Sequence, residues 1–140
     1  MRIVLAVDGS PISTRAARHV ASLHRQLADK PEVIVLYADA PLLRSVAMSL
    51  GTRGVDKYHA DNGRVALKGA KPVLSRAGVA FTEKVLVGDP APTILKFIKS
   101  SKCDLLVMGS RGLGAFKNLV LGSVATKILS MCDVPVTIVR

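Results

Sequence analysis

Small residues with permissive backbone geometry are concentrated after Met108, directly behind an apolar run typical of a buried strand. This stretch contains three glycines and two basic residues: Gly109, Gly112, Gly114, Arg111 and Lys117. Glycine lets the backbone approach a ligand closely. Gly122 and Ser123 then open a segment with helical periodicity, where free amides, the helix dipole and a hydroxyl favour an anion. We therefore predict a phosphate-binding loop that runs into a helix N-terminus.

Plain turn chemistry is the alternative for these glycines, because isolated glycines usually only shape turns. The context favours phosphate, since a strand end, a glycine cluster, basic side chains and a helix start coincide between Gly109 and Ser123. In an open parallel sheet, ligands bind beyond the carboxyl ends of the strands. Asp8 follows the first apolar run, so we interpret it as a ligand contact, with a helix cap as its alternative role.

Strand-like and helical segments alternate along the whole chain, which is typical of a parallel α/β sheet. The predicted strands are Ile3–Val7, Val33–Ala38, Phe81–Val87, Leu105–Met108 and Val136–Val139. Four of them are nearly continuous apolar runs, as expected of strands covered on both faces. The run from Phe81 is interrupted by Thr82, Glu83 and Lys84, so we place that strand at a sheet edge.

Helix starts are marked by capping residues followed by proline. We predict helices over Pro11–Ala28, Val55–Arg76, a segment from Asp89-Pro90, and a segment from Ser123 that ends before Pro135. Ser10 is a good N-cap, and proline tolerates the first helical position. Asp39–Gly54 has no clear periodicity and reads as a long loop, a kind of segment that often carries function.

Composition indicates one compact domain, because the 140 residues are 49% hydrophobic and no boundary interrupts them. The net charge of +10 favours anionic partners, although a solvated basic surface is a commoner use of such charge than nucleic-acid binding. Apolar runs fall far short of the roughly 18 residues of a bilayer span, and no secretory signal is visible. We expect a cytoplasmic protein without a membrane partner. Cys103 and Cys132 are too few for a disulfide framework or a zinc site.

The glycine spacing matches a known loop, although the Walker pattern and G-x-G-x-x-G are absent. Gly109-x-x-Gly112, nine residues, then Gly122-Ser123 resembles the G-2x-G-9x-G-[ST] loop of the universal stress protein family. The resemblance extends through IVLAVDGS, VIVLYADA, VGDPAPTI, MGSRGLG, LGSVATKIL and VPVTIV. It implies a single three-layer α/β/α domain over residues 1–140. Its five-stranded parallel sheet would have strand order 3-2-1-4-5, a Rossmann-like fold of the adenine nucleotide alpha hydrolase type.

The family's loop, which this one resembles, surrounds the triphosphate and ribose of ATP. By this resemblance, Asp8 matches an acidic residue on the adenine and ribose side, and Ala38 matches a small residue that lines the adenine. The predicted contacts in the loop are Met108, Gly109, Ser110, Arg111, Gly112, Gly122, Ser123 and Val124. Tyr37 stands where many members carry histidine, which implies different stacking or access near the base.

A dedicated catalytic role finds little support in the sequence. Hydrolysis needs a base for water and usually a metal-binding carboxylate, and Gly109–Val124 contains no Asp or Glu. The histidines lie in predicted helices, where surface or packing roles are commoner than catalysis: His19, His24 and His59. We expect at most slow ATP hydrolysis, with Mg²⁺ able to bridge the phosphates through mostly water ligands.

The resemblance implies an ATP-binding regulatory or sensor protein of the stress response. Members are commonly dimers, and the strand at Val134–Val139 is the expected homodimer edge. The alternative is a basic module that binds nucleic acid through a stripe on the second helix: Lys57, Arg64, Lys68 and Lys71. Tyr58 is the one aromatic residue near that stripe, so stacking on single strands gains no support.

Overall fold

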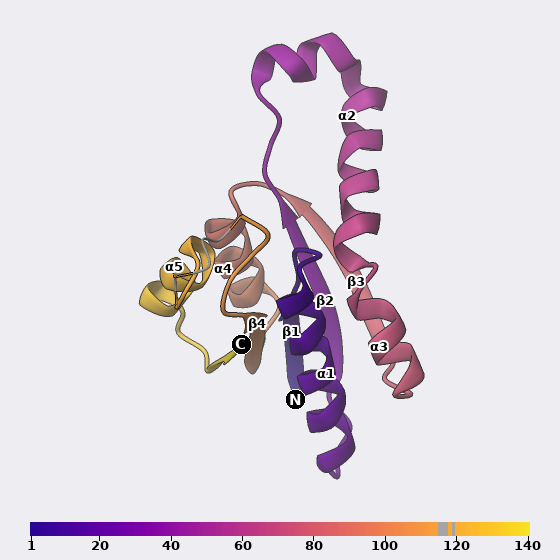
Figure 1. The fold of residues 1–140 in the computed structure, drawn as a ribbon, viewed down its shortest axis with the longest axis vertical. Coiled ribbons are helices and arrows are strands. Elements are labelled where there is room, and N and C mark those ends of the chain that lie inside the picture. Colours follow the sequence, from indigo (N-terminus) through magenta and orange to yellow (C-terminus); the bar gives the residue numbers. More distant parts are fainter. Residues whose placement is uncertain (115–117, 119) are drawn as a thin grey trace.

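The computed structural model describes residues 1–114, 118 and 120–140 and shows a parallel sheet between two helical layers (Figure 1). Its strands are β1 (Arg2–Ala6), β2 (Glu32–Asp39), β3 (Phe81–Val87), β4 (Leu105–Gly109) and β5 (Val136–Val139). Their spatial order is β3-β2-β1-β4-β5, and every neighbouring pair is parallel. The predicted fold and strand order are therefore confirmed. Lys117, predicted to add charge to the loop, lies outside the described residues.

Helices cover both faces of the sheet because successive side chains of a strand point to opposite faces. In β1, Ile3 and Leu5 belong to one buried cluster and Val4 to the other. The first cluster packs against α1 (Pro11–Gln26) and α3 (Ala70–Arg76). The second packs against α4 (Pro90–Ser100) and α5 (Ser123–Met131). The edge position predicted for β3 is confirmed, since most of its side chains are exposed.

The start of α1 follows from local capping chemistry. Ser10 adopts an extended conformation, and its hydroxyl accepts a hydrogen bond from the Ser13 amide at 3.1 Å. Pro11 occupies the first helical position, where its missing amide hydrogen costs no intrahelical bond. The predicted helix start is confirmed, which fixes the turn between β1 and α1 beside the site.

The segment predicted as a long loop is largely helical, which corrects the sequence interpretation. Helix α2 (Arg44–Leu67) begins well before the predicted Val55, and Gly51 interrupts it with φ 69° and ψ 174°. Positive φ favours glycine, so the chain bends there. The turns before Gly51 escaped detection because the run between Pro41 and Gly51 is too short to show a clear helical period, and Met48 interrupts it from the opposite face.

The predicted helix Val55–Arg76 is also divided. Helix α2 ends at Leu67, and α3 starts at Ala70. Pro72 explains the break, because proline lacks the amide hydrogen that would bond the carbonyl of Lys68 and its ring crowds that carbonyl. The division lets α3 pack on α1, while the last turns of α2 lie against β2 and β3 and its first turns extend beyond the sheet (Figure 1).

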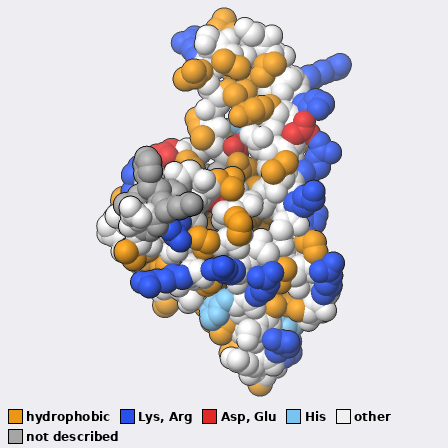
Figure 2. Space-filling view, in the orientation of Figure 1, with side chains coloured by type: hydrophobic (Ala, Val, Ile, Leu, Met, Phe, Trp, Pro, Cys, Tyr) orange, Lys and Arg blue, Asp and Glu red, His pale blue; other side chains and the backbone are white. Residues whose placement is uncertain are grey.

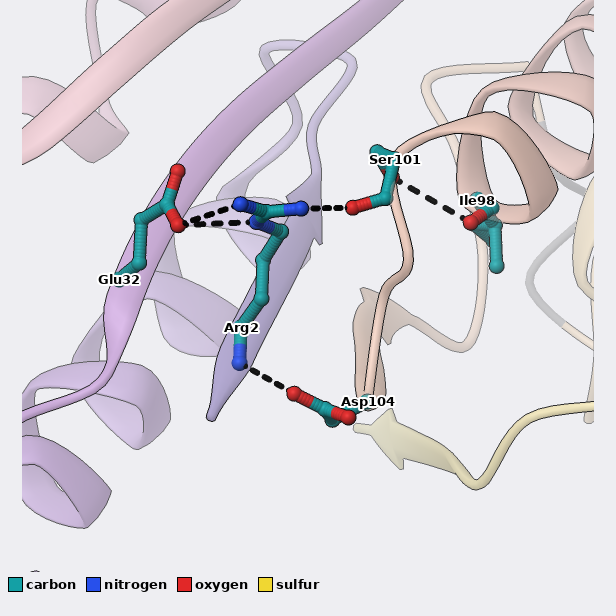
Figure 3. Close-up of polar contacts among 5 residues, drawn as sticks. All are labelled: Arg2, Glu32, Ile98, Ser101 and Asp104. Carbon is teal, nitrogen blue, oxygen red and sulfur yellow. Dashed lines mark hydrogen bonds and ion pairs between the residues drawn. The ribbon is translucent and has the colours of Figure 1, made fainter.

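Polar contacts join the strands at the amino end of the sheet (Figure 3). The Arg2 guanidinium pairs with Glu32 at 2.8 Å and also donates to the Ser101 carbonyl. The Arg2 amide donates to Asp104 Oδ2 at 2.6 Å. These contacts tie β1 to its neighbours at the end of the sheet opposite Asp8, which leaves the carboxyl end for ligand chemistry.

Candidate functional site

A cavity of about 590 Å³ opens at the carboxyl ends of β1, β2 and β4. Nine of the ten residues predicted from the sequence line it: Asp8, Ala38, Met108, Gly109, Arg111, Gly112, Gly122, Ser123 and Val124. Ser110 does not line it and is 1% exposed. The structure therefore brings the predicted set together, and nucleotide contact by these residues stays a prediction.

Ser110 positions the loop through its backbone. Its amide donates to the Val139 carbonyl of β5 at 2.7 Å, and its own carbonyl accepts from the Gly122 amide at 2.7 Å. One residue thus joins the end of β4, the last strand and the start of α5. Contact of Ser110 with a ligand stays a prediction.

Close packing explains the glycines on both sides of the loop. A Cβ on Gly122 would lie 3.3 Å from Arg111 Cα and 3.6 Å from the Gly112 nitrogen. A Cβ on Gly112 would lie 2.6 Å from Asp8 Oδ2, well inside contact distance. The two halves of the loop and the end of β1 therefore approach one another as only glycine allows.

The N-terminus of α5 faces the cavity without a side chain to cap it. Gly122 is the N-cap, in an extended conformation, and the first turn carries no acidic residue. The first amides of a helix have no intrahelical acceptor, and the dipole adds positive potential there. Ser123, Val124 and Ala125 all line the cavity. This end of the cavity is chemically suited to a phosphate group.

Asp8 joins β1 to the loop that follows β4. Its Oδ1 accepts from the Ser10 amide at 2.9 Å, and its Oδ2 accepts from the Leu113 amide at 3.1 Å. The N-cap of α1 is Ser10, so capping of that helix does not account for Asp8. The carboxylate lines the cavity and remains within reach of a ligand.

A second polar cluster at the cavity wall was missed by sequence reasoning. Asp39 is 6% exposed and lines the cavity with Tyr37. Tyr37 Oη donates to Asp39 Oδ1 at 2.9 Å, while Asp39 Oδ2 contacts His59 Nδ1 at 2.7 Å and Asn62 Nδ2 at 2.9 Å. Of the surface and packing roles expected of the histidines, His59 therefore has the packing role, as the buried partner of a carboxylate. The cluster fixes α2 against β2 beside the cavity.

The environment of these groups shifts their proton affinities in opposite ways. Burial acts to raise the pKa of Asp39, but the hydrogen bonds from His59, Asn62 and Tyr37 outweigh it and hold that pKa below its ordinary value. Burial and the neighbouring Asp39 carboxylate raise the pKa of Tyr37. Asp39 is thus a stable carboxylate and Tyr37 a neutral donor.

Two acids pair with three of the four basic residues in the stripe predicted on the second helix. Lys57 Nζ lies 2.8 Å from Asp61 Oδ2, and Arg64 contacts the same carboxylate. Lys71 Nζ lies 2.7 Å from Glu83 Oε1. The pairs are solvent-exposed and contribute little stability. They nevertheless reduce the positive potential on which the nucleic-acid alternative depends.

The described residues lack two further features, a metal-binding cluster and a membrane-spanning helix. In the described part of the chain, no cluster of three or more His, Cys, Asp or Glu is arranged to hold a metal ion. Among the same residues, no helix combines the length and apolar character needed to cross a membrane.

Comparison with known proteins identifies similar chains. A model of the universal stress protein family matches residues 1–140. Universal stress protein MJ0531 of Methanocaldococcus jannaschii is 29% identical over 99% of this chain and 81% of its own length. A universal stress protein of Thermus aquaticus is 35% identical over 99% of this chain and 97% of its own length. The solved structure of protein MJ0577 has a TM-score of 0.82 at 23% identity, covering 99% of this chain and 94% of that one.

Similar structures also exist with adenine nucleotides. A universal stress protein in complex with cAMP has a TM-score of 0.74 at 24% identity, covering 100% of this chain and 97% of its own. The Archaeoglobus fulgidus protein in complex with dAMP also has a TM-score of 0.74, at 22% identity, covering 100% of this chain and 98% of that chain. The Arabidopsis thaliana protein with AMP has a TM-score of 0.69 at 19% identity, covering 99% of this chain and 90% of that chain. At these identities the likeness establishes a common fold.

Proposed function

The chain belongs to the universal stress protein family, and from that premise we propose that it binds ATP in the cavity at the carboxyl ends of β1, β2 and β4. In this proposal the protein acts in the cytoplasm as a nucleotide-dependent regulatory or sensor protein of the stress response. The observation that carries the proposal is the uncapped, acid-free start of α5, packed against the loop of Gly109 and Gly112.

The residues around the cavity fit the parts of ATP. The loop amides and the start of α5 would hold the phosphates, since backbone donors at a helix N-terminus favour anions. Asp8 would accept from the sugar or base, and Ala38 would lie against the adenine. Mg²⁺ would bridge the phosphates with mostly water ligands. Neighbouring proteins with cAMP, dAMP and AMP support an adenine nucleotide, and the open α5 terminus favours additional phosphates.

The same proposal includes at most slow hydrolysis of ATP by this protein. Two carboxylates line the cavity among the described residues, Asp8 and Asp39. Both are already engaged as acceptors, Asp8 by two amides and Asp39 by three side chains. A carboxylate committed to positioning is poorly placed to activate water or bind a metal. Occupancy by ATP, and not turnover, would then be the signal.

Nucleotide titration of the wild-type protein tests the proposal directly. We expect adenine nucleotide to copurify and be identified by mass spectrometry after denaturation, and stripped protein to bind ATP more tightly than AMP or cAMP. Asp8→Ala should lower ATP affinity about 10-fold or more, because it removes a charged acceptor.

Asp104→Ala is the matched control, since Asp104 also accepts from a backbone amide but lies at the opposite end of the sheet. We expect it to leave ATP affinity unchanged. Protein that neither retains nor binds ATP would refute the proposed function. Equal losses in the two variants would refute the role of Asp8.

We also propose a homodimer through the outer edge of β5. The carbonyls of Pro135 and Val139 accept from the β4 side, so strand alternation leaves the backbone groups of Val136 and Ile138 at the edge. Because Ser110 joins Val139 to Gly122, a nucleotide at the start of α5 would be coupled to this edge.

Sedimentation velocity should show a dimer, and Ile138→Pro should shift it to monomer because proline removes an edge amide. A thermal unfolding curve of the variant checks that the fold is retained. A wild-type monomer at micromolar concentration, with and without ATP, would contradict this assembly.

A further inference from the structure

A projecting arm, residues 43–53, has no role in the proposed nucleotide site. It contains the first turns of α2 and the bend at Gly51, and it lies at one end of the long axis of the molecule (Figure 1). Neither Leu43 nor any later arm residue lines the cavity. A function of the arm would therefore be separate from the nucleotide site.

Large apolar side chains are exposed on this arm. Their exposed fractions are 75% for Leu43, 41% for Val46, 75% for Met48 and 47% for Leu50. Leu43, Val46 and Leu50 follow helical spacing and share one face, whereas Ser45 and Ser49 fall on the other. An exposed apolar face of this kind marks a contact surface, because single exposed residues are common and a contiguous group is not.

The charge around this face has one sign. Residues 40–55 contain no Asp or Glu, and Arg44 and Arg53 are exposed within the arm. Figure 2 shows hydrophobic side chains gathered on the arm with Lys and Arg at its margins. The whole chain carries a net charge of +10. The face is thus apolar at its centre and cationic at its borders.

We propose that the arm is an interfacial contact with an anionic lipid bilayer, inserting the face of Leu43, Val46 and Leu50 while Arg44 and Arg53 meet the headgroups. Amphipathic helices of this kind lie in the interface, with the apolar face buried about 5–10 Å. The earlier expectation of no membrane partner rested on the absence of a spanning segment. An interfacial arm touches the bilayer without crossing it.

Shape and charge favour a bilayer over other occupants. The arm is convex and lies at an extremity, where a planar surface can reach it without meeting the rest of the molecule (Figure 1). A second copy that docked arm to arm would set its own Arg44 and Arg53 against these two cations, with no acid in residues 40–55 to offset them. This inference is independent of ATP binding, since the arm residues lie outside the cavity.

Vesicle co-sedimentation of the full chain tests the proposal. We expect binding to vesicles of phosphatidylglycerol and phosphatidylcholine, weakened by high salt, and little binding to pure phosphatidylcholine. The double variant L43S/L50S should lower affinity at least about 10-fold, because it removes inserted apolar surface. Val65→Ser with Met131→Ser is the matched control, since these side chains are 68% and 66% exposed elsewhere.

The outcomes separate the possible occupants. Loss of vesicle binding in L43S/L50S, with the control pair and ATP titration unchanged, supports the proposal. No binding of the wild-type protein to anionic vesicles at low salt overturns it. Salt-sensitive binding that survives L43S/L50S also overturns it, because the general basic surface would then suffice. A wild-type protein that does not bind vesicles but changes its sedimentation coefficient in L43S/L50S would assign the arm to a second copy.

Discussion

Gly122→Val should lower ATP affinity about 100-fold or more while leaving a folded protein. A Cβ at this position would lie 3.3 Å from Arg111 Cα, so the branched side chain must push the start of α5 away from the loop. The backbone donors on both sides would then no longer converge on one phosphate group. Losing two charge-assisted hydrogen bonds at about 1.5–3 kcal/mol each accounts for an effect of this size. Isothermal titration with ATP measures it.

Gly114→Val is the control for this steric argument. Gly114 belongs to the same loop and lines the cavity, but a Cβ there meets nothing within 4 Å. We expect its ATP affinity to stay within about threefold of wild type, as for most unconstrained surface changes. ATP binding that survives Gly122→Val in a natively folded protein would show that the phosphates lie elsewhere.

The loop that lines the cavity was predictable because its determinants are local in the chain. Glycines, a serine and a helix start follow one another between Gly109 and Ser123, and their spacing is legible without a structure. The spatial strand order came from the family resemblance, since periodicity alone gives strands but not their neighbours. The sheet then placed Ala38 and Asp8 at the same cavity as the loop.

The features that escaped prediction depend on contacts between distant segments. Ser110 reads as a loop hydroxyl, and its role as a backbone link emerges only when β5 lies beside it. His59 reads as an ordinary helix residue, because its partner Asp39 lies 20 residues earlier in the sequence, on the other side of the arm. The arm reads as a loop in the sequence, since its helical turns are few and Gly51 and Gly54 interrupt them.

Asp39→Ala should destabilise the protein by about 3 kcal/mol. The change leaves three buried or half-buried donors without their acceptor, those of Tyr37, His59 and Asn62. Removing one partner of a buried charged cluster typically costs this much. For a chain of this size, the loss corresponds to a fall in Tm of about 10 °C. Urea denaturation monitored by circular dichroism gives the free energy of unfolding.

Asp61→Ala provides the comparison, because Asp61 pairs with Lys57 and Arg64 on the surface and should cost less than about 1 kcal/mol. Equal costs in the two variants would remove the basis for a stabilising cluster around Asp39. A loss of unfolding free energy confined to Asp39→Ala would show that the packing of α2 against β2 depends on this one carboxylate.

The pH dependence of that cost follows from the depressed pKa of Asp39. A carboxyl group whose folded-state pKa lies below its ordinary value of 3.8 stabilises the fold above that value. The contribution is lost as pH falls through the folded-state pKa. The difference in unfolding free energy between wild type and Asp39→Ala should therefore be constant from pH 7 to about 5 and shrink below about pH 4. A difference that persists unchanged at lower pH would mean that cavity formation, and not the charge of Asp39, accounts for the loss.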